Sequence, residues 1–312
     1  MAIRKQIFKA PSCDGRHELS GVVFIPEGKP KGFYQIVHGM TEHIARYEKF
    51  MSDMTENGFL CFGYDNLGHG NTVNDDSELG YIAPNEGWDL LARDVKAFSD
   101  AVFAAYKKED DIPYYLMGHS MGSFIARYAA SKYVKPCKLI VMGTGGANPA
   151  ASLGLGVIAV IKSIYGEKHF SPLVDKLAFG SYNKRFGGGT KDDPKPWLTN
   201  DESIRKKYYA DKFCSFNFTV SAMGDLISIM KYANADEWYS SLPKDMPILL
   251  VSGENDPVGN YGKGITEVKA KLEKQNIPVS MVLYPEARHE ILNDFCYEAV
   301  IKDILDFINK KL

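Results

Sequence analysis

The sequence lacks the features that carry a chain into or across a membrane. No run of about eighteen consecutive apolar residues occurs in it, whereas a helix that spans a bilayer needs roughly 20 such residues. Residues 1–6 do not begin the apolar run of a secretory signal peptide. We therefore expect a cytoplasmic protein without a transmembrane segment.

Cysteine is scarce and shows no pairing pattern. The five cysteines are an odd number, lie far apart and include no Cys-x-x-Cys pair: Cys13, Cys61, Cys137, Cys214 and Cys296. A disulfide framework normally has an even number at characteristic spacings. The pattern therefore indicates free thiols in a reducing compartment.

A surplus of positive charge is also absent. The chain has 37 Lys and Arg against 39 Asp and Glu, which gives a formal net charge of -2. A nucleic-acid-binding protein normally shows a basic surplus or a basic stripe, so we expect no nucleic-acid partner. The 312 residues are enough to bury a large core.

The chain does contain short apolar runs that alternate with amphipathic segments. Runs typical of buried strands occur at 33–37, 59–64, 114–117, 138–142, 247–252 and 278–284, and an opening hairpin is expected at 6–10 and 21–26. Helical spacing is found at 44–57, 88–108, 121–133, 264–274 and 295–309. This alternation predicts an α/β fold with a doubly wound, mostly parallel sheet of eight strands.

The alternation stops between residues 148 and 239. This stretch begins with an apolar segment at 150–165, contains three glycines at 187–189 and has an aromatic-rich run at 213–218. We expect a helical lid or cap inserted at the carboxyl edge of the sheet, where ligands bind in such folds. The predicted organisation is a core in two parts, 1–147 and 240–312, with the insertion at 148–239.

The motif Gly-His-Ser-Met-Gly at 118–122 lies between a predicted strand and a predicted helix. This order is typical of a nucleophile elbow, in which a strained turn exposes the serine and small neighbours let the strand and helix approach. Ser120 is therefore the candidate nucleophile. The helix that follows directs its N-terminal amides to the same point, where they stabilise negative charge.

A serine needs a base and a third group that orients the base. His289 follows the last predicted core strand, where the chain order Ser, Asp, His requires the base. The other histidines lie in the opening turn, in early loops, inside other motifs or in the insertion: His17, His38, His43, His69, His119 and His169.

The candidate acid is Asp256, which follows the predicted strand at 247–252 and precedes a proline. An Asp-Pro pair is also a frequent turn, and Glu254 and Asp245 are rival carboxylates. Asp245 precedes the strand and would lie at the opposite edge of the sheet. We therefore predict Asp256 as the acid.

The loop at 38–40 should supply part of an oxyanion hole. The amide of Met121, which follows the serine, is one expected donor, and the amide of Met40 is the second. Gly39 is expected to contribute to substrate binding. Glu42 and His43 suggest metal ligands, but no further residues stand at metal-site spacing, so we expect no metal and no cofactor.

Taken together, these motifs resemble the α/β-hydrolase superfamily, and within it the lysophospholipase and monoacylglycerol lipase-like branch also called serine aminopeptidase or Hydrolase 4. The resemblance covers nearly the whole chain and rests on His-Gly-Met-Thr-Glu-His (38–43), Gly-His-Ser-Met-Gly (118–122), Gly-Glu-Asn-Asp-Pro-Val (253–258) and Arg-His-Glu (288–290). It implies a serine ester hydrolase that uses Ser120, Asp256 and His289, with Glu42 and His43 bracing the oxyanion loop.

Three functional hypotheses remain open. The first is a carboxylesterase for a single-chain lipid or another apolar acyl ester, with transient contact between the lid and a membrane surface. The apolar residues at 153–161 would then border an acyl channel, unless they merely seal the lid onto the core. The second is an aminopeptidase or amidase with the same triad, for which Asp225, Asp236 and Glu237 are available to hold a substrate ammonium. The third is a non-catalytic binding module. The oligomeric state is not specified.

Overall fold

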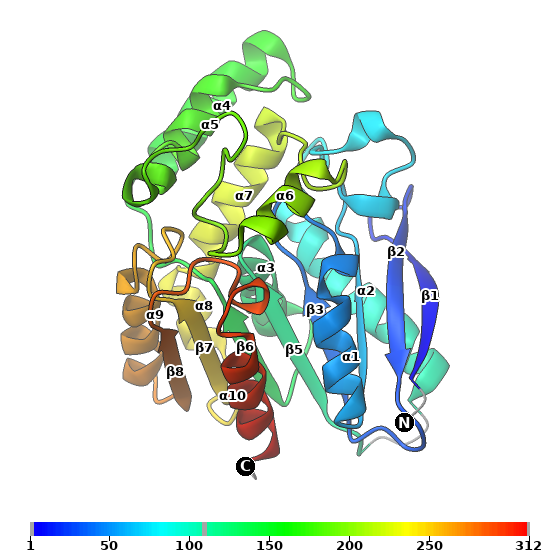
Figure 1. Cartoon of the computed structure of the whole chain (residues 1–312). Helices are drawn as coiled ribbons and strands as arrows, with labels where there is room; N and C mark the ends of the chain where they lie inside the picture. The colour runs from blue at the N-terminus through cyan, green and yellow to red at the C-terminus, as the bar shows by residue number, and fades with distance from the viewer. Residues whose placement is uncertain (1–2, 108–110, 311–312) are drawn as a thin grey trace.

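The computed structural model describes residues 3–107 and 111–310. The first two residues of the predicted core and its last two lie outside this range, and so does Lys108, where the predicted helix at 88–108 ends. Figure 1 shows a single sheet flanked by helices, with further helices above one end of the sheet.

All eight predicted strands are present, and each end lies within three residues of its predicted position. They are β1 (Arg4–Pro11), β2 (Glu18–Ile25), β3 (Gly32–Val37), β4 (Phe59–Tyr64), β5 (Tyr114–His119), β6 (Lys138–Met142), β7 (Ile248–Gly253) and β8 (Val279–Tyr284). The sheet order is β1-β2-β4-β3-β5-β6-β7-β8. β2 pairs antiparallel with β1 and β4, and all other neighbours are parallel.

The strands from β3 to β7 are buried at every position because helices cover both faces of the sheet. One face packs against α2 (Gly87–Tyr106), α3 (Met121–Lys132) and α9 (Lys263–Lys274), and the other against α1 (Glu48–Glu56) and α10 (Tyr297–Asn309). Figure 1 shows α1 and α10 in front of the sheet and α2 and α3 behind it.

Short 3-10 helices complete the core part of the chain. They are η1 (Ile44–Tyr47), η2 (Gly70–Thr72), η3 (Asp76–Glu78) and η5 (Ile291–Asn293). The helix predicted at 44–57 is thus a 3-10 turn that continues into α1. Among the described residues, no helix combines the length and the apolar character that a bilayer crossing requires.

Residues between β6 and β7 form the helical insertion, which contains α4 (Ala151–Tyr165), α5 (Pro172–Phe179), η4 (Tyr182–Phe186), α6 (Glu202–Ala210), α7 (Val220–Ala233) and α8 (Asp236–Ser241). Figure 1 shows α4 and α5 at the top, farthest from the sheet. The end of the insertion joins the core layer, since the Trp238 indole donates to the Arg127 carbonyl at 2.6 Å.

Candidate active site

Ser120 occupies the turn between β5 and α3 with φ 53° and ψ -122°, a backbone conformation that is unusual for a residue with a side chain. The glycines on either side make this turn possible. A Cβ on Gly118 would lie 2.1 Å from the Gly122 carbonyl oxygen, and one on Gly122 would lie 2.1 Å from that of Val37. The strand, strained turn and helix predicted around Ser120 are therefore present.

His289 and Asp256 are in direct contact at the carboxyl edge of the sheet, the edge at which Ser120 also lies. Asp256 follows β7 and His289 follows β8, and both are almost completely buried, with 0% and 2% exposure. His289 Nδ1 lies 2.9 Å from Asp256 Oδ2. The carboxylate also accepts from the Ser252 hydroxyl at 3.1 Å and from the Val258 amide at 2.8 Å, so its orientation is fixed.

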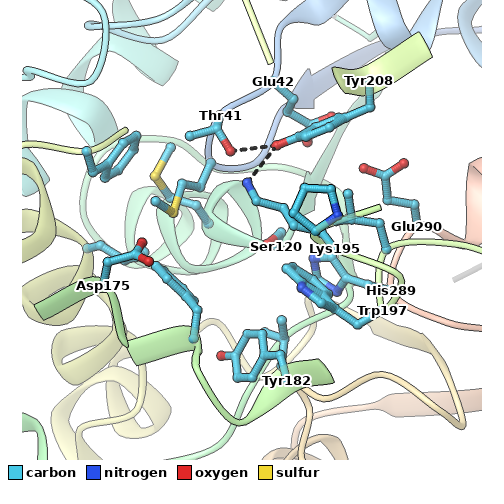
Figure 2. Close-up of a pocket in the computed structure, with 18 of the residues that line it drawn as sticks. Thr41, Glu42, Ser120, Asp175, Tyr182, Lys195, Trp197, Tyr208, His289 and Glu290 are labelled. Atoms are coloured by element: carbon cyan, nitrogen blue, oxygen red, sulfur yellow. Dashed lines mark hydrogen bonds between the residues drawn. The ribbon is translucent and has the colours of Figure 1, made fainter. Parts of the chain in front are cut away.

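Ser120 and His289 line one cavity of about 310 Å³ (Figure 2). In the part of the chain that the structure describes, the Ser120 hydroxyl makes no hydrogen bond, either to His289 or to another group. Catalytic hydrogen bonds are often long without substrate and shorten in the complex. The predicted nucleophile and base thus face the same space without being joined in this state.

The rival residues are occupied elsewhere or exposed. Glu254 and Asp245 are exposed. His38 is buried, accepts from the Asn66 amide at 2.9 Å and contacts the Gly39 carbonyl at 2.8 Å. Burial lowers its pKa, so the neutral form of His38 is favoured and braces the loop.

The loop after β3 is held by buried side chains on both sides of Met40. The Gly39 amide donates to Glu42 Oε1 at 2.6 Å, and the Thr41 amide donates to His69 Nε2 at 3.3 Å. Met40 and Met121 both line the cavity beside Ser120.

Gly39, the predicted substrate-binding residue, is not among the described residues that line the cavity. Its amide is already used by Glu42. A Cβ at this position would lie 3.0 Å from the Ser120 Cβ, so Gly39 allows the loop to approach the serine.

A buried charge network borders the cavity that contains Ser120. Arg46 bridges Glu42 and Glu290 with distances of 2.6–2.8 Å, and Glu42 also contacts His119 Nδ1 at 3.2 Å. Burial alone would raise the pKa of Glu42, but the hydrogen bond with His119 and the Arg46 charge hold it well below its usual value.

His119 belongs to the same network and was not singled out by the sequence. Burial opposes its protonation, but the hydrogen bond to Glu42 and the Glu42 charge give a raised pKa. Its Nε2 lies 3.3 Å from the His289 carbonyl oxygen. His119 therefore connects the loop after β3, through Glu42, with the loop that carries His289.

One group of potential metal ligands is brought together by the fold. Ligand atoms of His43, Asp211 and Cys214 lie within 4.8 Å of one another. His43 and Asp211 are 168 positions apart in the sequence. The short spacing that is typical of metal-ligand motifs therefore could not reveal this cluster. His43 Nε2 lies 2.9 Å from Asp211 Oδ2, so these two groups satisfy each other. None of the three is among the residues lining the cavity at Ser120.

The cavity has two charged side chains that sequence reasoning missed, Asp175 from α5 and Lys195 from the segment before α6. Asp225, Asp236 and Glu237, the carboxylates predicted to be available for a substrate ammonium, are not among its described lining residues. Asp225 instead accepts from the Trp88 amide at 3.1 Å near the start of α2.

A second cavity of about 310 Å³ adjoins the first. It is mainly apolar and lies between α4, α5 and α7, with Leu153, Val157 and Ile158 among its lining residues. Four residues line both cavities: Phe179, Tyr182, Leu226 and Met230. Part of the apolar segment of α4 therefore borders a cavity that shares a wall with the cavity at Ser120.

Comparison with known proteins agrees with the fold and the motifs. The family model described as serine aminopeptidase, S33 (Hydrolase 4) matches residues 28–295. The structure of a thermostable carboxyl esterase from Bacillus coagulans, in complex with glycerol, superposes with a TM-score of 0.89 at 30% identity, covering 99% of this chain and 98% of that one.

Curated relatives include monoacylglycerol lipase of Mycolicibacterium smegmatis, which is 21% identical over 95% of this chain and 98% of its own length. Monoglyceride lipase of Mus musculus is 30% identical over 34% of this chain. The alignments cover only 32% of the mouse protein and 28% of an abhydrolase domain-containing protein of Dictyostelium discoideum.

Proposed function

Since this chain belongs to the serine aminopeptidase (S33), or Hydrolase 4, family of α/β-hydrolases, we propose that it hydrolyses carboxylic esters with Ser120 as the nucleophile. The observation that carries the proposal is the cavity shared by a strained serine and a histidine whose Nδ1 lies 2.9 Å from a buried aspartate. A similar carboxyl esterase and monoacylglycerol lipase support the ester bond as the target.

In the proposed reaction, Ser120 Oγ attacks the ester carbonyl carbon while His289 Nε2 takes the hydroxyl proton. Asp256 holds the other ring nitrogen and stabilises the imidazolium. The amides of Met40 and Met121 bind the oxyanion. The imidazolium returns its proton to the leaving alcohol, and a water activated by His289 then releases the acid from the acyl-enzyme.

We assign the helical insertion (148–239) the role of a lid whose helices hold the acyl chain. Support comes from the second, apolar cavity, which shares Phe179, Tyr182, Leu226 and Met230 with the first. Each methylene buried there would stabilise a bound chain by about 0.8 kcal/mol. A single-chain apolar acyl ester is therefore the proposed substrate.

A cytoplasmic location is part of the same proposal. All five cysteines are free thiols. Cysteines in oxidising compartments commonly pair, whereas those in the cytosol stay reduced.

The test is hydrolysis of medium-chain p-nitrophenyl esters by Ser120→Ala and by Ser131→Ala, whose serine lies on α3 and donates to the Tyr128 carbonyl. We expect Ser120→Ala to lower kcat by roughly a thousandfold or more and Ser131→Ala to retain activity. A fluorophosphonate probe should label the wild type and leave Ser120→Ala and His289→Ala unlabelled. Substantial hydrolysis by Ser120→Ala would overturn the proposal.

An aminopeptidase is the second candidate, and Asp175 is the observation that favours it. Its carboxylate lines the cavity and has no hydrogen-bond or ion-pair partner among the described residues, so it is available to a substrate ammonium. Amino-acyl naphthylamides assayed beside the esters separate the two functions. Faster turnover of the naphthylamides, lost in Asp175→Asn, would establish the peptidase.

A further inference from the structure

Lys195 places an ammonium group on the wall of the cavity that holds Ser120. Its Nζ donates to the Tyr208 hydroxyl at 3.4 Å, and this hydroxyl lies 2.7 Å from Thr41 Oγ1. Thr41 directly follows Met40 in the proposed oxyanion loop. Figure 2 shows the Lys195 side chain reaching across the site toward Tyr208 and Thr41, close to Ser120 in this view.

No carboxylate in the described part of the chain lies within 4.0 Å of this ammonium to form an ion pair. The two nearby glutamates that line the cavity, Glu42 and Glu290, are both bound by Arg46. Burial lowers the pKa of Lys195, while the more distant charges of Asp175 and Glu290 act in the opposite direction. The cation is therefore partly desolvated without a direct counter-charge.

Packing alone does not explain a charge at this position. The Tyr208 hydroxyl is already held by Thr41, and the backbone of Lys195 is held separately, because its amide donates to the Tyr209 hydroxyl at 2.9 Å. A methionine would fill the same space without the cost of desolvating an ammonium. The ammonium also lies 5.3 Å from the centroid of the Tyr208 ring, a contact that leaves it without an anionic partner among the described residues. An anionic ligand can supply that partner.

We propose that Lys195 binds an anionic group on the substrate, a carboxylate or a phosphate carried by the alcohol that leaves. The proposal rests on the proposed ester hydrolysis and narrows its substrate class to single-chain esters with an acidic head group. The acyl chain would enter the apolar cavity through the wall that contains Leu226 and Met230. The head group then remains on the side of Thr41, Tyr208 and Lys195.

Asp175 strengthens this orientation. It lines the same cavity, and Figure 2 shows its carboxylate away from the Lys195 ammonium, which is turned toward Tyr208 and Thr41. A carboxylate repels an anion at short range. An acidic head group therefore has one favourable side in the cavity.

The experiment compares three octanoyl esters that differ only in head group: those of glycerol, glyceric acid and glycerol 3-phosphate. We expect the wild type to prefer at least one acidic ester over the neutral one in kcat/KM. A hydrogen bond to a charged group supports a change of roughly 10- to 100-fold. Lys195→Met should lose this preference, measured as the ratio of kcat/KM for the acidic esters to kcat/KM for the glycerol ester, and Lys195→Arg should retain most of it.

The matched control is Lys191→Met, because Lys191 is exposed, lies four positions away and is absent from the described cavity lining. Its substrate preference should equal that of the wild type. Comparing kcat/KM of the wild type for the glyceric acid ester and the glycerol 3-phosphate ester shows whether the site prefers a carboxylate or a phosphate. An unchanged ratio of acidic to neutral hydrolysis in Lys195→Met would overturn the inference.

Binding gives a readout that does not require turnover. Calorimetric titration of Ser120→Ala with glycerol 3-phosphate should show binding that Lys195→Met in the same background weakens roughly tenfold or more. If Ser120→Ala still hydrolyses esters, the proposed function fails. If hydrolysis depends on Ser120 but Lys195→Met alters neither binding nor preference, only the inference about Lys195 fails.

Discussion

Buried carboxyl groups in this protein differ in pKa because their neighbours differ. Glu42 is surrounded by Arg46 and His119, and its pKa is held well below the usual value. Asp94 in α2 is bound by neutral donors only, the Ser12 hydroxyl at 2.9 Å and the Cys13 amide at 2.7 Å. Burial therefore raises the pKa of Asp94 to about 6.

The raised pKa of Asp94 predicts a pH-dependent stability. The protonated form is favoured in the folded state, so the contribution of this group is complete below the ordinary pKa of 3.8 and is lost as pH rises through about 6. Relative to Asp94→Asn, the wild type should lose on the order of 3 kcal/mol between pH 4 and 7, because each pKa unit corresponds to about 1.4 kcal/mol. Urea unfolding of both proteins at each pH measures the difference.

The control is Asp100→Asn, since Asp100 is an exposed residue of the same helix. Its unfolding free energy should stay within about 0.5 kcal/mol of the wild type. A difference between Asp94→Asn and the wild type that does not change with pH would contradict the prediction.

Single residues could be placed from the sequence where they directly follow a strand. Ser120, Asp256 and His289 each come after a strand whose apolar run is visible in the sequence, and parallel strands end at one edge of the sheet. Asp175 and Lys195 lie in the insertion. No regular alternation of apolar and polar residues there indicates which way a side chain points. Their presence in the cavity depends on tertiary packing, so no pattern in the sequence indicates it.

At the scale of elements, the segment before α6 pairs with the loop that carries His289. The Glu290 amide donates to the Leu198 carbonyl at 2.7 Å, and the Thr199 hydroxyl donates to the Asn293 carbonyl at 2.6 Å. Trp197 also packs against the imidazole of His289, with ring centroids 5.2 Å apart. Part of the helical insertion therefore braces the loop of the proposed base.

Thr199→Val tests whether this contact positions His289, which would change kcat, without affecting substrate binding, which would change KM. The substitution keeps the side-chain volume and removes the hydroxyl that donates to the Asn293 carbonyl and accepts from the Asp201 amide. Leaving these groups unpaired costs about 1–3 kcal/mol of stability. We expect kcat for a p-nitrophenyl ester to fall roughly tenfold or more, because a displaced base lowers the rate, while KM changes little.

Thr190→Val is the matched control, because Thr190 is exposed in the same insertion and accepts only from the Asp193 amide. It should retain the wild-type kcat. A Thr199→Val protein that is less stable yet has the wild-type kcat would show that the contact supports the fold and not the position of His289.

The strands and helices of the core could be predicted from the sequence one by one, whereas the insertion could be predicted only as helical, without its individual helices, for a physical reason. Strands from β3 to β7 are buried at every position, so each is a continuous apolar run bounded by polar loops. Helices of the insertion pack partly on one another and partly on a cavity. Apolar residues lie on both faces of α4, because Ile158 is buried and Val160, on the opposite face of the same helix, is 58% exposed. The apolar pattern therefore does not reveal which face packs on the rest of the protein.

At the scale of the whole molecule, exposed apolar side chains gather on the outer helices α4 and α5. Leu153, Ile164, Leu173 and Leu177 are 57–74% exposed, and Leu153 and Leu177 also line the second cavity. Figure 1 shows these helices at the top of the molecule, farthest from the sheet. We propose that this apolar surface contacts a lipid surface, from which a single-chain substrate enters the second cavity.

Replacing apolar residues that lie outside both cavities tests the lipid contact without altering the site. Ile164→Ser with Leu173→Ser should lower partition onto phosphatidylcholine vesicles roughly tenfold or more, because burial of each side chain in an apolar phase is worth about 1.5–3 kcal/mol. Cosedimentation measures partition, and hydrolysis of water-soluble p-nitrophenyl butyrate should remain within about twofold of the wild type. Ile7→Ser, at a 73% exposed residue of β1, should partition as the wild type does. Equal partition of the double variant and the wild type would rule out this surface as the contact.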